Sequence, residues 1–360
     1  MNILIPAVTS GIALLFAVLL LDQWRVRRRS FQLVWAAGML FFGVASGCEA
    51  VGATSVGWNE AMYRTWYLAG AMWTAGWLGL GTALLLGKTR FGYAFAAGLV
   101  LAGLFTLLTQ QRNQYPGTGW APVVYLVAAL VLALAIAVET YFASERWPRL
   151  AALAVGGVTV VSLGLMMTTA LEPPGYLLLP SGLPDPALFP GTLRLLTPFM
   201  NITGGLSLAL GALFSAYVFM PKRRVLAYSL DPAQKGDELL FNLVIGCVAI
   251  PVNFVASLPG AVRAFFAGRL HNRVPATILI AIGGFLAAGP DLLSRFGMLD
   301  YTGTGKLLAV IFLLAGFLVS SDAFAEFRVP FTGIVLRHRR KPGQEPESEA
   351  TAERLGTGPA

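Results

Sequence analysis

Apolar residues occur along the chain in runs of about twenty, and short polar segments separate these runs. A run of this length lets an α-helix cross a hydrocarbon core of roughly 30 Å, because a helix rises about 1.5 Å per residue. The short alternating segments that are typical of transmembrane β-strands do not occur in the sequence. We therefore predict an all-α, polytopic helical membrane protein. Seven spans are expected before residue 221, at 3–22, 31–54, 65–87, 91–109, 121–143, 150–171 and 199–220.

The distribution of basic residues predicts the orientation of this seven-helix bundle, residues 1–224. If the N-terminus lies outside, the inner loops contain eleven Lys and Arg and the outer loops contain three. Cytoplasmic loops of membrane proteins carry such an excess of positive charge. We therefore expect a multi-pass protein of the cell inner (plasma) membrane with its N-terminus outside. The inner set is Arg25, Arg27, Arg28, Arg29, Lys88, Arg90, Arg146, Arg149, Lys222, Arg223 and Arg224, and the outer set is Arg64, Arg112 and Arg194.

A polar linker at 225–238 leads into a second unit, residues 239–336, which contains three apolar segments. If all three crossed the membrane, the basic run Arg337–Lys341 would lie outside, against the charge rule. We expect one segment to be re-entrant instead, and Pro251 makes the first segment the candidate, with a long kinked helix as the alternative. The three segments are 240–257, 274–289 and 307–326.

With one segment re-entrant, the C-terminus returns to the cytoplasmic side, and two polar segments of this second half have their own predictions. The stretch 261–273 has Phe265 and Phe266 among arginines, a pattern that favours an amphipathic helix at the membrane interface. Residues 337–360 begin with a basic run and continue with few apolar side chains, so a disordered cytoplasmic tail is expected there.

The composition narrows the class of protein further. The chain is 56% hydrophobic and 12% charged, and soluble domains carry about 25% charged residues. The net charge of +8 does not indicate nucleic-acid binding, because the basic residues occur in short clusters between apolar runs. Cys48 and Cys247 lie in separate apolar runs without a CxxC motif, so we predict neither a disulfide nor a metal site.

The sequence lacks the motifs that accompany most enzyme chemistry in membranes. It contains no HExxH, P-loop, GxSxG or CxxC motif. The two histidines lie in or beside basic, interfacial segments, which argues against haem ligation inside the bundle. Every lysine lies in a loop or near the end of a span, which argues against a retinal Schiff base. We therefore expect a protein that is not an enzyme and has no cofactor.

Glu49 is the most unusual residue of the predicted spans. It lies in the outer half of span two, where a carboxylate is costly and normally has a partner. Arg64 begins the next span on the same side, beside Trp66 and Tyr67. The pattern predicts that Glu49 and Arg64 pair under an aromatic lid that includes Tyr67. This corner would recognise a ligand or would be a structural ion pair.

Span three carries three tryptophans, Trp66, Trp73 and Trp77. Trp66 lies near the outer boundary, where aromatic side chains anchor helices, and needs no further role. Trp73 and Trp77 lie near mid-membrane on the same stripe, and their indole N–H groups need acceptors there. We expect these acceptors on another helix, with Asn201 and Thr203 as candidates. The two side chains would line a binding pocket or pack in the core.

Three polar residues of the second unit could serve transport. Asp322 and Glu326 lie one helical turn apart near the predicted inner boundary, where they would bind a proton or cation, or cap the helix and form a salt bridge. Asn253 flanks the expected break at Pro251 and could bond the carbonyl groups that the proline frees. A substrate that crossed the membrane would meet the ends of such a broken helix.

The stretches "GMLFFGVASGCEAVGA" and "EAMYRTWYLAGAMWTAGWLGLGTALLL" resemble in layout the seven-span N-terminal sensor region of some bacterial histidine kinases. The resemblance covers residues 1–224. In that family a span ends with an acidic residue and a short outer loop leads into an aromatic-rich third span. No kinase, cyclase or phosphatase domain follows in this chain, so the resemblance implies ligand sensing without a recognisable output domain.

Three functions are open from the sequence alone. The first is sensor-like binding of a small or lipidic ligand from the outer side, by Glu49, Arg64, Tyr67, Trp73 and Trp77 with Asn201. The second is a transporter of a small solute or ion, and the third is a structural subunit of a larger membrane complex. The partners expected are membrane lipid, a small-molecule ligand and another membrane protein.

Overall fold

The structure, a computed structural model, describes residues 3–142, 145–180, 182–228, 238–294, 302–320, 326–328 and 335–337. Within these ranges it is almost entirely helical, and eight helices are long and apolar enough to cross a membrane. This confirms the predicted helical class, and the eight apolar helices are compatible with a polytopic membrane protein. The first seven of these helices coincide with the seven predicted spans to within a few residues, except that the seventh begins eight residues earlier than predicted.

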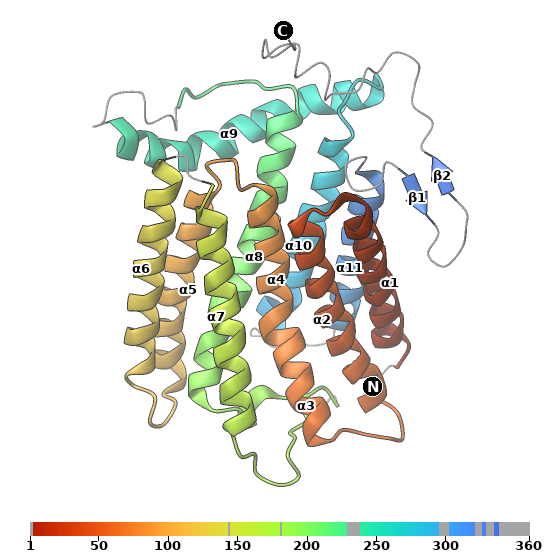
Figure 1. Cartoon of the computed structure of the whole chain (residues 1–360), viewed down its shortest axis with the longest axis vertical. Coiled ribbons are helices and arrows are strands. Elements are labelled where there is room, and N and C mark those ends of the chain that lie inside the picture. Colours follow the sequence, from red (N-terminus) through yellow and green to blue (C-terminus); the bar gives the residue numbers. More distant parts are fainter. Residues whose placement is uncertain are drawn as a thin grey trace.

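Apart from α9, the long helices run along one common axis and alternate in direction (Figure 1). The first half contains α1 (Leu4–Arg27), α2 (Ser30–Gly52), α3 (Glu60–Trp66), the π-helix η1 (Tyr67–Trp73), α4 (Thr74–Leu85), α5 (Gly92–Asn113), α6 (Ala121–Tyr141), α7 (Trp147–Thr168), the 3₁₀ turn η2 (Pro186–Leu188) and α8 (Gly191–Phe219). The second half contains α9 (Glu238–Phe266), α10 (Arg273–Ser294) and α11 (Thr302–Val319), followed by β1 (Glu326–Arg328), which pairs antiparallel with β2 (Val335–Arg337).

The predicted basic loops lie at one end of the bundle. The connections between α1 and α2, between α4 and α5, and between α6 and α7 lie at the end that also carries α9, and the N-terminus lies at the opposite end (Figure 1). The alternation that the charge rule assumed is therefore present in the fold. That the α9 end faces the cytoplasm stays a prediction from the charges.

Helix α9 corrects the prediction for segment 240–257. It is one continuous helix that contains both Pro251 and Pro259, so the expected break is not present and the segment agrees with the alternative of a long helix. Both prolines lie on the exposed side of α9, where the missing amide hydrogen bonds disturb no packed contact. Figure 1 shows α9 lying across the end of the bundle instead of running along it. The predicted re-entrant segment and the start of the predicted interfacial stretch are thus parts of a single transverse helix.

The hairpin of α10 and α11 belongs to the same core as the N-terminal helices. Phe317 of α11 packs edge-on against Phe16 of α1 and Trp35 of α2, with ring centroids 4.8 and 4.9 Å apart. Ile280 of α10 lies in this cluster, as does Leu208 of α8. The expected division into a separate seven-helix bundle and a C-terminal unit is therefore not a boundary in the packing.

Helices α4 and α8 approach each other closely because glycines face each other at their crossing. A Cβ added at Gly79 or at Gly204 would collide with backbone atoms of the opposite helix. Small residues permit this close approach between membrane helices, which gain little from hydrophobic burial in lipid. This contact holds α8 against α4, and α5, α6 and α7 pack on α8.

Candidate functional site

Glu49 forms a buried ion pair with a residue far away in the sequence. Its side chain is 5% exposed, and Nζ of Lys306 on α11 lies 2.7 Å from Oε1. The indole Nε1 of Trp66 donates to the same oxygen at 2.9 Å. We call Glu49, Trp66 and Lys306 the outer ion-pair cluster. It joins α2, α3 and α11 near the end of the bundle that is predicted to face outward.

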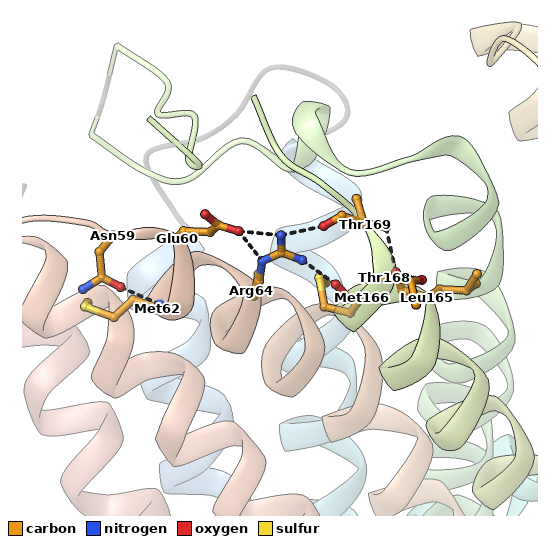
Figure 2. Close-up of polar contacts among 8 residues, drawn as sticks. All are labelled: Asn59, Glu60, Met62, Arg64, Leu165, Met166, Thr168 and Thr169. Carbon is orange, nitrogen blue, oxygen red and sulfur yellow. Dashed lines mark hydrogen bonds and ion pairs between the residues drawn. The ribbon is translucent and has the colours of Figure 1, made fainter. Parts of the chain in front are cut away.

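The predicted pair of Glu49 and Arg64 is wrong. Arg64 bonds Glu60 one helical turn earlier, and its guanidinium also donates to the carbonyl oxygens of Met166 and Thr169 (Figure 2). These carbonyls lie at the C-terminal end of α7, where a helix leaves its last acceptors without intrahelical partners. Arg64 therefore caps α7 and ties it to α3, and it does not compensate the charge of Glu49.

Trp66 also has a role that the sequence analysis missed. It was interpreted as an interfacial anchor, but its N–H bonds the buried carboxylate of Glu49. Lys306 was noticed only as a lysine near the end of a span, and 257 residues separate it from Glu49. No local pattern connects two such residues. Only the packing of α11 beside α1, with Phe317 against Trp35 of α2, brings them together.

The acceptors predicted for Trp73 and Trp77 are wrong as well. Trp73 Nε1 donates to Ser162 Oγ at 3.0 Å, and Trp77 Nε1 donates to Thr159 Oγ1 at 3.2 Å. Both acceptors lie on α7 and not on α8, where Asn201 and Thr203 were proposed. The expectation that the acceptors belong to another helix is confirmed.

The π-helix η1 explains why the three tryptophans face different neighbours. Its seven residues lie between Trp66 and Thr74, and a π-turn contains more residues than an α-turn. In an ideal α-helix Trp66 and Trp73 would lie on the same face. With the π-helix between them they lie on different faces. Trp66 turns toward α2 and bonds Glu49, whereas Trp73 turns toward α7.

Protein side chains fill the predicted aromatic corner. The ring of Tyr67 packs 4.3 Å from that of Phe189, which comes from the loop before α8. The hydroxyl groups of Tyr67 and Thr197 are hydrogen-bonded at 2.8 Å. Tyr67 is 3% exposed and belongs to a buried cluster with Tyr63. This corner has the character of a packed core that closes the outer end of the bundle.

The residues considered for transport are not brought together in the part of the chain that the structure describes. Asn253 is fully buried on α9, where its Oδ1 accepts from the amides of Val225 and Leu226 at 2.7 and 2.9 Å. Its Nδ2 donates to the carbonyl of Leu226 at 2.8 Å, so the side chain fastens the loop after α8 to α9. Asp322 lies outside the described residues, and Glu326 begins strand β1, opposite Arg337.

An apolar groove of about 400 Å³ lies among α5, α6, α7 and α8. We call it the lateral groove. Helix α6 packs more closely on α5 than on α7, which leaves the space between α6 and α7 open. Tyr125 and Thr203 contribute the only side-chain polar atoms to its lining. The lining residues are Phe95, Leu99, Val124, Tyr125, Ala128, Ala129, Leu132, Leu153, Ala154, Val155, Gly157, Val158, Val161, Leu196, Phe199, Met200 and Thr203.

Thr203 is the unusual residue of this lining. It is 2% exposed, and its hydroxyl has no hydrogen-bond partner. Three other buried helical threonines, Thr82, Thr106 and Thr140, donate to the carbonyl four residues earlier. A buried polar group without a partner costs about 1–3 kcal/mol. The hydroxyl of Thr203 is therefore an unpaired polar group enclosed by the packing beside the groove.

The mouth of the lateral groove contains two consecutive glycines of α7, Gly156 and Gly157. A Cβ added at either position would meet no atom within 4 Å. Gly157 lines the groove and Gly156 does not. The sequence did not reveal the groove, since its walls are ordinary apolar positions of four helices. The pair of adjacent glycines at 156–157 was the one local signal.

The described residues contain no group of three or more His, Cys, Asp or Glu that could hold a metal ion. The two cysteines are free thiols, with Cys48 half-buried and Cys247 exposed. No family model, no curated protein and no solved structure matches this chain. The resemblance to sensor regions of histidine kinases therefore rests on the sequence patterns alone.

Proposed function

We propose that this protein is a non-enzymatic integral membrane protein that binds a lipidic ligand, and that the ligand enters the lateral groove directly from the bilayer. The proposal keeps the ligand class that the sequence suggested and moves the site from the Glu49 corner to the face formed by α6 and α7. The volume of about 400 Å³ lies within the range of small-molecule sites, which is roughly 300–1,000 Å³.

The observation that carries this proposal is the groove itself, a space of about 400 Å³ that is lined almost entirely by apolar side chains of four helices. Ligand sites of this kind are mostly apolar. An apolar lining of this kind matches the hydrocarbon part of a lipid.

The outer ion-pair cluster has a supporting role in this proposal. Glu49 and Lys306 satisfy each other's charge, and Trp66 adds a third contact. The pair joins α11 to α2 and so holds the hairpin of α10 and α11 in the bundle. Protein side chains, and not a ligand, thus explain the buried carboxylate.

Two neighbouring substitutions test the proposal. Gly157→Leu places a side chain at the groove, and Gly156→Leu places the same side chain on an adjacent face without steric conflict. Both changes raise helix propensity by a similar amount, so their effects on folding are matched. Lipid that remains with the purified protein is measured by native mass spectrometry.

We expect lipid to remain bound to the wild type and to Gly156→Leu and to be lost from Gly157→Leu. Equal retention of lipid by the wild type and both variants would contradict the proposal. Loss of lipid from both variants would also contradict it, since the effect would then have no connection with the groove.

A second candidate function, a subunit of a larger membrane complex, is supported by α9. The side of this helix that faces away from the bundle is apolar and exposed, with Val244, Val248, Val255 and Phe266 each more than half exposed. The mass of the particle extracted in a mild detergent tests this candidate. A mass above that of one chain plus detergent would support a complex, and a monomer mass would exclude it.

A further inference from the structure

Helix α9 has a polar side that is fastened to the loop after α8. Asn253 accepts hydrogen bonds from the amides of Val225 and Leu226 in this loop. The hydroxyl of Ser257, one turn later on α9, accepts from the amide of Arg223. The loop passes α9 on the side that is farther from the middle of the bundle (Figure 1). The polar side of α9 therefore points away from the bilayer that the bundle would cross.

A second side of α9 packs against the ends of two helices of the bundle. It contributes to an apolar cluster with the last turn of α8 and the first turn of α10, whose members include Tyr217, Met220, Phe254, Leu258 and Val274. Helix α9 therefore lies beside the end of α8, at the level where the chain leaves the bundle and where the membrane interface is expected.

The remaining side of α9 is apolar and exposed. Val244 and Val262 lie nine residues before and after Asn253, which is about two and a half helical turns, so they project from the opposite side of the helix. They are 68% and 53% exposed. Because the polar side points away from the bilayer, this opposite side faces the bilayer, and the bundle does not cover it. Membrane lipid fits such a surface better than water does.

The charges near this apolar side are all positive. No Asp or Glu occurs between residues 239 and 290 or between residues 220 and 230. Arg263 and Arg269 are exposed near the end of α9, with the exposed rings of Phe265 and Phe266 between them. The loop after α8 adds the exposed cations of residues 222–224. An apolar helix side with basic flanks is typical of segments that lie in the membrane interface and attract anionic lipids.

We infer that α9 is embedded in the interface of the leaflet at its end of the bundle, and that Arg263, Arg269 and the basic residues 222–224 bind the headgroups of anionic phospholipids. The apolar side with Val244 and Val262 contacts the acyl chains of the same leaflet. The charge rule predicts that this end is cytoplasmic, and cytoplasmic leaflets are rich in anionic lipid. This inference concerns a surface separate from the lateral groove and does not depend on it.

The depth of α9 is measured with the full chain in nanodiscs of equal parts phosphatidylglycerol and phosphatidylcholine. A fluorophore is attached to a single cysteine, in Val255→Cys or Val262→Cys, after Cys48 and Cys247 have been replaced by alanine. Val225→Cys in the loop after α8 is the matched control, because Val225 is also more than half exposed. The quenchers are iodide in the water and phospholipids that carry a nitroxide either near the headgroup or near the end of the acyl chain.

We expect the labels at Val255 and Val262 to be quenched most by the shallow nitroxide, since interfacial helices lie about 5–10 Å below the headgroup boundary. The label at Val225 should be quenched most by iodide. Strongest quenching of the α9 labels by the deep nitroxide would show a membrane span, and strongest quenching by iodide would show a surface in water. Protection from all three quenchers would show that another protein covers this side. Each of these three results would overturn the inference.

The choice of headgroup is tested with phosphatidylglycerol and phosphatidylcholine of identical acyl chains, whose binding to the full chain in detergent is measured by native mass spectrometry. One cation near anionic headgroups contributes a factor of about five in affinity. Arg263→Gln should therefore weaken the binding of phosphatidylglycerol about fivefold, and Arg263→Gln with Arg269→Gln about 25-fold, without effect on phosphatidylcholine. Arg112→Gln, at the other end of the bundle, is the control and should retain the preference. Equal binding of both lipids to the wild type, or an equal loss in Arg112→Gln, would overturn the assignment of anionic lipid to α9.

Discussion

The strongest test of the packing concerns the ion pair of Glu49 and Lys306. Lys306→Met leaves the carboxylate of Glu49 with the indole of Trp66 as its partner in the outer ion-pair cluster. Glu49→Leu leaves the ammonium of Lys306 without that carboxylate. The double substitution removes both charges and fills the space with apolar side chains. These three variants and the wild type form a double-mutant cycle.

The magnitude follows from the geometry of the pair. Two unit charges 2.7 Å apart attract by about 6 kcal/mol at an effective dielectric constant of about 20. Desolvation of the two groups, which are 5% and 24% exposed, offsets most of this attraction. Removal of one partner from a buried pair costs about 3–5 kcal/mol, and replacement of both is nearly neutral. We expect each single variant to lower the free energy of unfolding by about 3 kcal/mol and the double variant to change it little, which gives a coupling energy of about 6 kcal/mol.

The assay is equilibrium unfolding in mixed micelles, with the free energy of unfolding measured for all four proteins. The ion pair of Lys88 and Glu145 is the control, because its nitrogen and oxygen are 3.4 Å apart and its side chains are 86% and 70% exposed. An exposed pair of this kind should show a coupling energy below about 0.5 kcal/mol. Additive effects of Glu49→Leu and Lys306→Met would refute the reasoning, because a buried ion pair in direct contact should be energetically coupled.

Three further substitutions give distinct expectations for the free energy of unfolding. Without ligand, Thr203→Val should raise the free energy of unfolding by about 1 kcal/mol or more, because an unpaired buried hydroxyl is removed. Thr106→Val should lower it, because the hydroxyl of Thr106 is hydrogen-bonded. A decrease for Thr203→Val would show that its hydroxyl has a partner. Trp73→Phe should lower it by about 1 kcal/mol through loss of the bond to Ser162, and the same loss in a Ser162→Ala background would exclude that bond as the cause. Asn253→Leu leaves the amides of Val225 and Leu226 without acceptors and should expose the loop after α8 to protease before the helices unfold; unchanged cleavage would contradict the role of Asn253.

The spans could be predicted from the sequence because the signal is local. A run of apolar residues long enough to cross a bilayer can be recognised within about twenty consecutive residues, and basic loops lie between such runs. Helix α9 was not predicted correctly for the same reason. Its hydropathy resembles that of a span, and the two prolines suggested a break, but its orientation across the bundle depends on contacts such as that of Asn253 with the loop at 225–226.

The candidate sites could be predicted only in part, because their partners are distant in the sequence. The cost of a buried carboxylate indicated correctly that Glu49 has a partner. The nearest cation, Arg64, was the wrong choice, since the carbonyls at the end of α7 bind it and since Lys306 arrives from α11. The lateral groove could not be predicted, because a gap between helices depends on how four helices diverge and not on any residue type.

The most direct test of the central claim is an experimental structure of the protein in lipid nanodiscs prepared from total membrane lipid. The account predicts lipid density in the groove between α6 and α7. A groove that is closed by its own side chains and holds no such density would contradict it.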